Sequence, residues 1–343
     1  MLALLLAVAA SAQTLPPAPR GFGDWMVGCD NRRDCQAVGF ADPSEPSGVD
    51  PDAPPFIGII VSRKAEVQAE PSIEIDQRFF ELDDYSGDII ADGKKTAFGF
   101  DKSGDLVGDA RQFVRVLAAS STVVVRGPRG DTLGAFRTRG ASAALRWMDD
   151  RQLRGGTVTA IVAAGTSPPS AVPPPPPLPK IALPPISSKP PRQLTAAQIA
   201  AARKPFDLCD EPRGRVEYYR IDAAHSIAIV DCWSGPYQSD GIIVLVPDRG
   251  QPRLAPLEAA TEEELKGPAH ERSRLISPDY DPDRRLLFMN YRGRGLNDCG
   301  ANGSWAWDGT AFRLASYGAL NECRGVTARL PYWQTANDPS AHE

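Results

Sequence analysis

The sequence predicts an α+β protein that is predominantly antiparallel β, built as two disulfide-stapled β-rich domains joined by a Pro-rich linker. Three observations support this prediction. Both halves contain short β-branched runs separated by turn residues, a central segment has 12 prolines in 26 positions, and the chain carries six cysteines. With 343 residues, the chain is long enough for two domains of ordinary size.

Residues 1–12 have the pattern of a cleavable export signal. An apolar run ends in Ala10-Ser11-Ala12, the small-x-small pattern that signal peptidase recognises. The run is too short to span a bilayer, which takes about 20 apolar residues. We expect a mature protein that lacks residues 1–12, is periplasmic or secreted, and does not span a membrane. The alternative is a frayed N-terminus.

The first domain is predicted over residues 20–166. The run FIGIIVSR at 56–63 is rich in β-branched residues, as expected of a buried strand. Similar runs predict strands at 25–29, 72–76, 122–126 and 132–137, with turns at Asp92-Gly93 and Gly130-Asp131. Apolar residues at helical spacing predict helices over 109–118 and 142–152, the second ended by Gly155-Gly156.

Residues 167–192 are predicted to form the extended linker. Because proline cannot donate a backbone hydrogen bond, we expect this segment to stay solvated in the polyproline II conformation. At ~3.1 Å per residue it reaches roughly 80 Å. A semi-rigid spacer is the simpler interpretation. The alternatives are a docking ligand for a proline-binding partner and a strut through the cell-wall mesh.

The second domain is predicted over residues 193–338. Thr195 is a suitable N-cap for a short helix that runs through Arg203. Asp308-Gly309 is a hairpin turn signal between two apolar runs. The strands are predicted at 215–219, 226–233, 241–246, 286–291, 303–307 and 311–317.

The six cysteines are predicted to form three disulfides. None lies in a C-x-x-C pair and the chain has only three histidines, so zinc and thioredoxin-like spacings are absent. An even set in an exported protein indicates structural disulfides. Since a linker separates the halves, we expect sequential pairing: Cys29–Cys35, Cys209–Cys232 and Cys299–Cys323.

No catalytic constellation is visible in the sequence. The H-E-x-x-H, G-x-S-x-G and P-loop patterns are missing, and His225, His270 and His342 are scattered. We interpret the carboxylates at Asp149-Asp150 and at 262–264 as solvated surface charge. We therefore predict no cofactor and no enzyme. A wall glycosidase, in which two distant carboxylates meet in the fold, stays open as an alternative.

Asp279, Asp281 and Asp283 alternate as in a calcium-binding loop. An EF-hand also needs glycine at the sixth position and glutamate at the twelfth, where this chain has Arg284 and Asn290. We interpret the segment as a turn before a hairpin and predict no metal site. Calcium binding is the alternative.

The main candidate binding site is the glycine-rich segment 291–299 with the aromatic residues after it. Arg292, Arg294 and Asp298 lie in this segment, and a disulfide is expected to pin it. Trp305 and Trp307 share a face of one strand, so they could stack on a sugar. In the alternative interpretation, the rings cover the β core and the arginines pair with Asp298 or its neighbours. The segment 232–237 has the same ambiguity.

The charge balance argues against a nucleic-acid partner. The chain has 38 Lys and Arg against 43 Asp and Glu, a net charge of −5. An acidic chain lacks the positive surface that general nucleic-acid binding or polybasic membrane attachment requires.

Three segments of the sequence resemble known bacterial families. They are GFGDWMVGCDNRRDCQAVGF, SAALRWMDDRQLRGGTVTAIVA and YRGRGLNDCGANGSWAWDGTAFRLA, and together they are similar to the domain of unknown function 1176 (DUF1176) family. The first half also resembles the invasion-associated locus B family through Phe22, Gly23, Asp24, Trp25, Val27 and Cys29. These resemblances imply an exported, disulfide-bonded envelope protein of a Gram-negative bacterium, with no established activity.

We expect a non-enzymatic protein that binds an envelope protein or a cell-wall component. The alternative is a periplasmic inhibitor of a lysozyme-type cell-wall hydrolase, in which Arg292 or Arg294 enters an acidic cleft. That alternative rests on analogy between small disulfide-bonded β modules.

Overall fold

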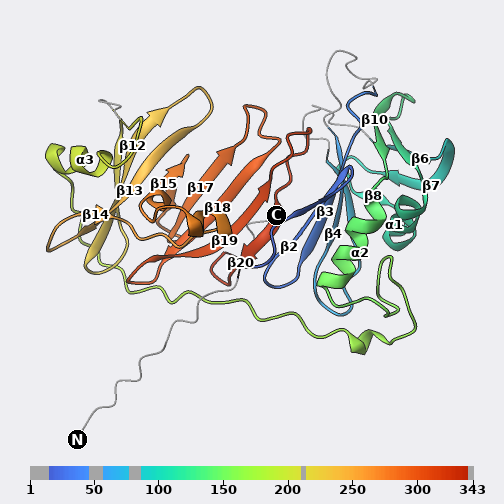
Figure 1. The fold of residues 1–343 in the computed structure, drawn as a ribbon, viewed down its shortest axis with the longest axis horizontal. Helices are drawn as coiled ribbons and strands as arrows, with labels where there is room; N and C mark the ends of the chain where they lie inside the picture. Colours follow the sequence, from blue (N-terminus) through green and yellow to red (C-terminus); the bar gives the residue numbers. More distant parts are fainter. Residues whose placement is uncertain (1–14, 46–56, 77–85, 210–213, 339–343) are drawn as a thin grey trace, which may run out of the picture.

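The computed structural model describes residues 15–45, 57–76, 86–209 and 214–338 (Figure 1). All pairs of neighbouring strands within its four sheets are antiparallel, and the helices are few and short. The predicted fold class, mostly antiparallel β with few helices, is therefore confirmed. Among the described residues, no helix has the length and apolar character needed to cross a membrane.

Two sheets form the first half of the chain, which lies on the right of Figure 1. One sheet contains β1 to β5 in chain order, and the other has the order β10-β9-β6-β7-β8. The strands are β1 (Arg20–Phe22), β2 (Trp25–Cys29), β3 (Cys35–Phe40), β4 (Gly58–Arg63), β5 (Ser72–Asp76), β6 (Gly87–Ala91), β7 (Lys94–Phe100), β8 (Leu106–Val107), β9 (Thr122–Arg126) and β10 (Thr132–Arg137).

Two helices, α1 (Ala110–Ala119) and α2 (Ala141–Arg151), complete the core of the first half. The side chain of Asp109 caps α1 by accepting the backbone N–H of Gln112 at 2.8 Å. Both helices bury an apolar stripe in the core that the two sheets share, as their spacing predicts.

Asp149 on α2 corrects one prediction. Its side chain is fully buried rather than solvated, and it accepts the backbone N–H groups of Ile161, Val162 and Ala163 at 2.8–3.1 Å. The carboxylate fixes the loop that follows the helix, because it takes up three backbone donors that would otherwise lack partners.

Two further sheets form the second half. One has the order β11-β12-β13-β14 with β15 paired to β13, and the other contains β16 to β20 in chain order. Their facing sides share one apolar core, and α3 (Ala196–Arg203) packs on the opposite side of the first sheet. The remaining elements are β11 (Val216–Arg220), β12 (His225–Ser234), β13 (Ser239–Pro247), β14 (Arg253–Leu254), α4 (Glu262–Lys266), β15 (Arg274–Ile276), β16 (Asp279–Asp281), β17 (Leu286–Arg292), β18 (Gly300–Trp307), β19 (Phe312–Leu320) and β20 (Leu330–Gln334).

Residues 167–192, here called the strap, run along the outside of the molecule and touch both halves (Figure 1). Ile181 is 7% exposed and packs against Leu286, Ala306 and Ala315 of the second half. The expectation that this segment stays solvated is therefore wrong for these contacts. Strap carbonyls also accept hydrogen bonds from arginines of both halves: Arg33 to Pro174, Arg285 to Pro184 and Arg220 to Pro190.

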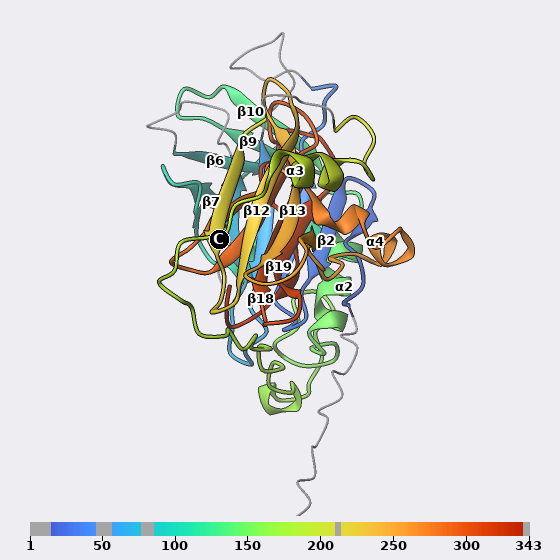
Figure 2. The ribbon, with the colours of Figure 1, turned by 90° about the vertical axis from the view of Figure 1, so that its left-hand side faces the viewer.

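The two halves pack directly against each other: β20 of the second half lies next to β2 of the first in Figure 1, and in Figure 2 the second half stands in front of the first. The side chain of Asn31 exchanges two hydrogen bonds with the backbone of Gln334, at 2.8 and 3.0 Å. A shared apolar cluster joins β3 and β4 to the C-terminal segment: Val38, Phe40 and Ile60 with Leu320, Val326, Ala328 and Leu330. Separation of the halves by a spacer is thus contradicted, while the domain boundaries at 20–166 and 193–338 stay a prediction.

Candidate functional site

The three disulfides form as predicted. Cys29–Cys35 joins the ends of β2 and β3, Cys209–Cys232 ties the segment after α3 to β12, and Cys299–Cys323 closes the segment around β18 and β19. The last two bonds lie directly beside the two loops that the sequence singled out as candidate binding sites.

The first candidate binding loop covers residues 291–299 and is here called the arginine loop. It joins β17 to β18. The Cys299–Cys323 disulfide packs so closely against it that a Cβ on Gly293 would lie 2.5 Å from the Sγ of Cys299. Glycine is therefore required at this position for steric reasons. The backbone N–H of Gly293 also bonds the carbonyl of Cys299 at 2.9 Å, which closes the loop.

Within the arginine loop, Arg294 is held by Asp298. Its Nε donates to Oδ1 of Asp298 at 2.7 Å and its Nη2 donates to Oδ2, while Asp298 is fully buried and also accepts the backbone N–H of Gly325 at 2.7 Å. Burial alone raises the pKa of Asp298, but these hydrogen bonds outweigh it and the pKa lies below its ordinary value. This is the ion pair that the alternative interpretation expected.

Arg292 is placed differently. Its backbone N–H bonds the side-chain oxygen of Gln238 at 3.2 Å, which ties the arginine loop to the β12–β13 loop. Its half-buried guanidinium has no ion-pair partner within the described part of the chain. Of the two arginines, Arg292 is therefore the one available to a partner.

Trp305 and Trp307 do not form a surface platform. Each is 2% exposed, and both belong to the core between the two sheets of the second half. Their indole N–H groups donate to the carbonyl of Glu258 and to the carboxylate of Asp222 at 2.8 and 2.7 Å. The interpretation as core residues is correct, and the rings are not available to stack on a sugar at the surface.

Exposed large hydrophobic residues lie instead in the segment 232–237 and in the arginine loop. Trp233, Tyr237, Tyr291 and Leu296 are each 41–45% exposed. A Cβ on Gly295 would lie 3.7 Å from the ring of Tyr237, so the two loops are in contact. Together with Arg292 these residues are here called the loop surface. These aromatic residues could be noted in the sequence. The contact between the two loops could not, because they lie more than fifty positions apart in the chain.

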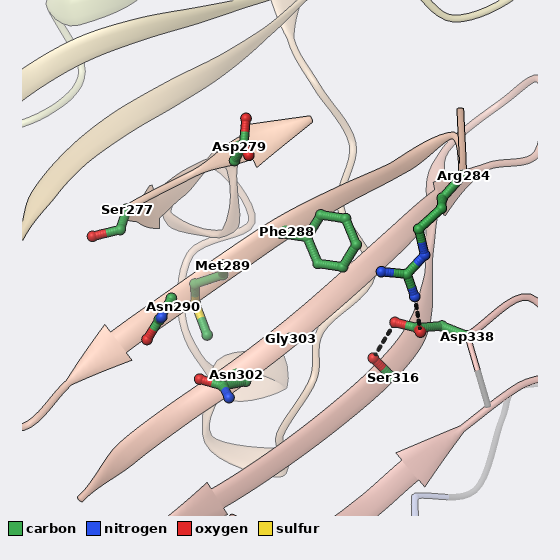
Figure 3. A pocket seen from close by; sticks show the side chains of 10 residues that line it. All are labelled: Ser277, Asp279, Arg284, Phe288, Met289, Asn290, Asn302, Gly303, Ser316 and Asp338. Carbon is green, nitrogen blue, oxygen red and sulfur yellow. Dashed lines mark hydrogen bonds and ion pairs between the residues drawn. The ribbon is translucent and has the colours of Figure 1, made fainter. Parts of the chain in front are cut away.

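A hollow of about 460 Å³ opens on the outer face of the β16–β20 sheet (Figure 3). Its lining includes Asp279, Arg284, Phe288, Asn290, Asn302 and Asp338. Sequence reasoning missed this site, because its residues come from four strands (β16 to β19), the β16–β17 turn and the C-terminal segment, and they form no local motif.

Of the three aspartates considered as a calcium loop, Asp281 is engaged by the turn itself. Oδ1 of Asp281 accepts the backbone N–H groups of Asp283 and Arg284 at 2.8 and 3.0 Å, as in an Asx turn. Over the described ranges, no group of three or more His, Cys, Asp or Glu side chains could hold a metal ion.

An acid–base pair occurs at Asp222 and His225. The Nδ1 of His225 lies 2.8 Å from Oδ2 of Asp222, which also accepts the indole N–H of Trp307. The adjacent Ser226 hydroxyl is buried and accepts the backbone N–H of Arg192 at 3.2 Å. The neighbouring hydroxyl is thus already engaged in the fold and is not positioned as a nucleophile.

A buried polar cluster lies where the two halves meet. Asp30 is 1% exposed, accepts a hydrogen bond from the side chain of Gln334, and accepts the backbone N–H groups of Arg32 and Asp34 at 2.8 and 2.9 Å. Burial, and next the nearby charge of Asp34, raise the pKa of Asp30 to about 7.

These features define a disulfide-bonded, mostly antiparallel β protein with an exposed loop surface and a polar hollow. The chain belongs to the family described as "Protein of unknown function (DUF1176)", whose model matches residues 19–337. The resemblance to this family is thereby confirmed, while similarity of the first half to the invasion-associated locus B family stays a prediction.

A curated relative shares nearly the full length of the chain. It is the uncharacterized protein YpfG of Escherichia coli (strain K12), which is 25% identical over 325 residues, covering 90% of this chain and 89% of YpfG. No solved structure matches the chain.

Proposed function

We propose that this protein is an exported, non-enzymatic binding protein of the Gram-negative envelope, and that its loop surface contacts a protein partner. The observation that supports this proposal most directly is the exposure of two tyrosines and a tryptophan on two touching segments, one of which carries Arg292, an arginine without an ion pair among the described residues. Tryptophan, tyrosine and arginine are the residues most enriched at the energetic centres of protein interfaces.

The two disulfides beside the loop surface also favour binding. Cys232 immediately precedes Trp233, and Cys299 ends the arginine loop. A loop that is fixed before binding loses less conformational entropy when the complex forms, so more of the contact energy appears as affinity.

Export is supported by the apolar segment 1–12, by the three disulfides and by the resemblance of Phe22 to Cys29 to the invasion-associated locus B pattern. We expect the protein recovered from a periplasmic extract to begin at Gln13. Intact-mass measurement checks this. A mass that retains residues 1–12, or recovery with the cytoplasmic fraction, would contradict export.

Site-specific crosslinking tests the loop surface. With a photo-reactive phenylalanine analogue at Tyr291 of the full chain, irradiation of intact cells should give one discrete protein adduct. Arg292→Glu should abolish that adduct because it reverses the charge that faces the partner. The same analogue at Val107, 55% exposed in the first half, is the control and should not give this adduct. No adduct at position 291, or an adduct that survives Arg292→Glu, would refute the proposal.

Inhibition of a lysozyme-type hydrolase is the second candidate function, and the free guanidinium of Arg292 favours it. An arginine without its own carboxylate partner suits an acidic catalytic cleft. The oxidised protein should slow lysis of cell walls by lysozyme, and Arg292→Ala should remove most of this inhibition. Arg294→Ala alone should change inhibition less, because Arg294 is already paired with Asp298. Undiminished inhibition by a variant that carries both Arg292→Ala and Arg294→Ala would exclude the arginine loop as the inhibitory element.

A further inference from the structure

The hollow on the β16–β20 sheet lies on the face that the strap only partly covers. Ile181 of the strap packs on Leu286, and Phe288, two residues further along β17, lies beside this contact and lines the hollow. Its volume of about 460 Å³ falls within the roughly 300–1,000 Å³ of typical ligand sites. The open part of the face is therefore large enough for a small molecule.

Two side-chain amides project from adjacent strands into this space. Asn290 of β17 and Asn302 of β18 are register partners, and neither side chain has a hydrogen-bond partner among the described residues. The Oδ1 of Asn290 is buried without a donor. Buried polar atoms are nearly always paired, so an amide left in this state is unusual. The pair offers both donors and acceptors to a ligand.

The opposite side of the hollow is fixed by Asp338 (Figure 3). This 1% exposed carboxylate accepts the hydroxyls of Ser304 and Ser316 at 2.6 and 2.8 Å and the guanidinium of Arg284 at 2.6 Å. Arg284 in turn lies 5.1 Å over the ring of Phe288. Polar groups held this way need little rearrangement when a ligand binds.

The charges of the lining argue against an anionic ligand. Arg284 is neutralised by Asp338, and the carboxylate of Asp279 is the one charge of the lining without an ion-pair partner among the residues that the structure describes. A ligand that fits must exchange hydrogen bonds in both directions, place an apolar face near Phe288, and carry no negative charge. We propose that the hollow binds a neutral sugar, whose hydroxyls pair with Asn290 and Asn302 and whose C–H face lies against Phe288.

Saturation-transfer NMR and calorimetry on the oxidised mature protein test this site. The probes are glucose, galactose and N-acetylglucosamine, with glucuronate as the anionic comparison. At least one neutral sugar should bind more tightly than glucuronate. Absence of saturation transfer from all three neutral sugars, or preference for glucuronate, would overturn the proposal.

Paired variants place the binding in the hollow. Asn290→Ala with Asn302→Ala should weaken binding of the neutral sugar by about thirtyfold, because two hydrogen bonds are lost. Gln251→Ala removes an exposed amide from the β13–β14 turn and should leave affinity unchanged. An unchanged melting temperature of the double variant controls for folding. Equal affinity of the double variant and the wild type would mean that the sugar binds elsewhere.

Discussion

The pKa values of two buried aspartates, Asp30 and Asp298, are shifted in opposite directions. The pKa of Asp30 is raised to about 7 by burial and by the charge of Asp34, and its side-chain partner, Gln334, is neutral. The pKa of Asp298 is raised by burial as well, yet the guanidinium of Arg294 and the N–H of Gly325 bring it below its ordinary value. A charged donor at hydrogen-bond distance thus decides the sign of the shift.

Asp30 makes stability depend on pH. Because the native state holds this proton more tightly than the unfolded chain does, stability falls as pH rises from about 4 to about 7. Asp30→Asn should therefore be more stable than wild type near pH 8, on the order of 4 kcal/mol, and equal to it near pH 4. Urea unfolding at both pH values measures this. Asp88→Asn, an exposed surface change, is the control. A pH-independent difference would contradict the assignment.

Replacing Arg294 should lower the free energy of unfolding more than replacing its partner Asp298. Arg294→Ala leaves a buried carboxylate without its charged donor and should cost about 3 kcal/mol. Asp298→Asn leaves only a partly exposed arginine unpaired and should cost less, about 1–2 kcal/mol. The stabilisation by Asp298 is present at neutral pH and is lost as pH falls below about 4. Denaturant titrations rank the two variants, and the reverse order would refute the argument.

At the scale of elements, strands with continuous apolar or alternating runs could be predicted from the sequence. The predictions at 25–29, 72–76, 122–126 and 132–137 match β2, β5, β9 and β10. The strands β6 and β7 were missed, because Lys94–Phe100 contains two lysines and a glycine, and pairing with β6 holds it in the sheet.

The candidate site was harder to predict than the strands. Spacing placed Trp305 and Trp307 on one face of a strand, and this is correct, but spacing cannot say whether that face is covered. The ion pair of Arg294 is local and was among the alternatives. The contact between the arginine loop and the β12–β13 loop depends on tertiary packing, which no sequence motif reports.

The Cys209–Cys232 disulfide should stabilise the element that carries Trp233. It closes a loop of 23 residues, which is worth about 3 kcal/mol in the chain-entropy account. Replacing both cysteines with serine should lower the free energy of unfolding by about that amount and weaken crosslinking at position 291. Unfolding measured with and without reductant separates this bond from the other two. Equal stability of variant and wild type would show that α3 and β12 hold the loop alone.

At the scale of the whole molecule, the first sheet is covered on both faces. The run at 57–61 is apolar without alternation, which is typical of a strand buried on both sides. Its second face is covered by residues that lie more than 250 positions later, and such a partner cannot be identified from one sequence. The prediction of two separated modules failed for this reason.

Leu330→Ala should weaken the contact between the halves. Leu330 is fully buried in their shared cluster, and truncation of such a leucine typically costs about 2–5 kcal/mol. Calorimetry should show one unfolding transition for the wild type and two for the variant. Leu314→Ala, in the core of the second half alone, is the matched control and should lower the melting temperature while keeping a single transition. A single shifted transition for Leu330→Ala would contradict this account.

The shared cluster also means that the first sheet cannot complete its core until the end of the chain is present. A chain is made from its N-terminus, so Val38, Phe40 and Ile60 exist long before Leu320, Val326 and Leu330 are added. Until then the first sheet has one uncovered apolar face, the kind of surface that promotes aggregation. Residues 320–330 therefore complete the core of a sheet that ends at residue 76, and a chain cut short before Leu320 leaves one face of that sheet uncovered in whichever compartment it folds.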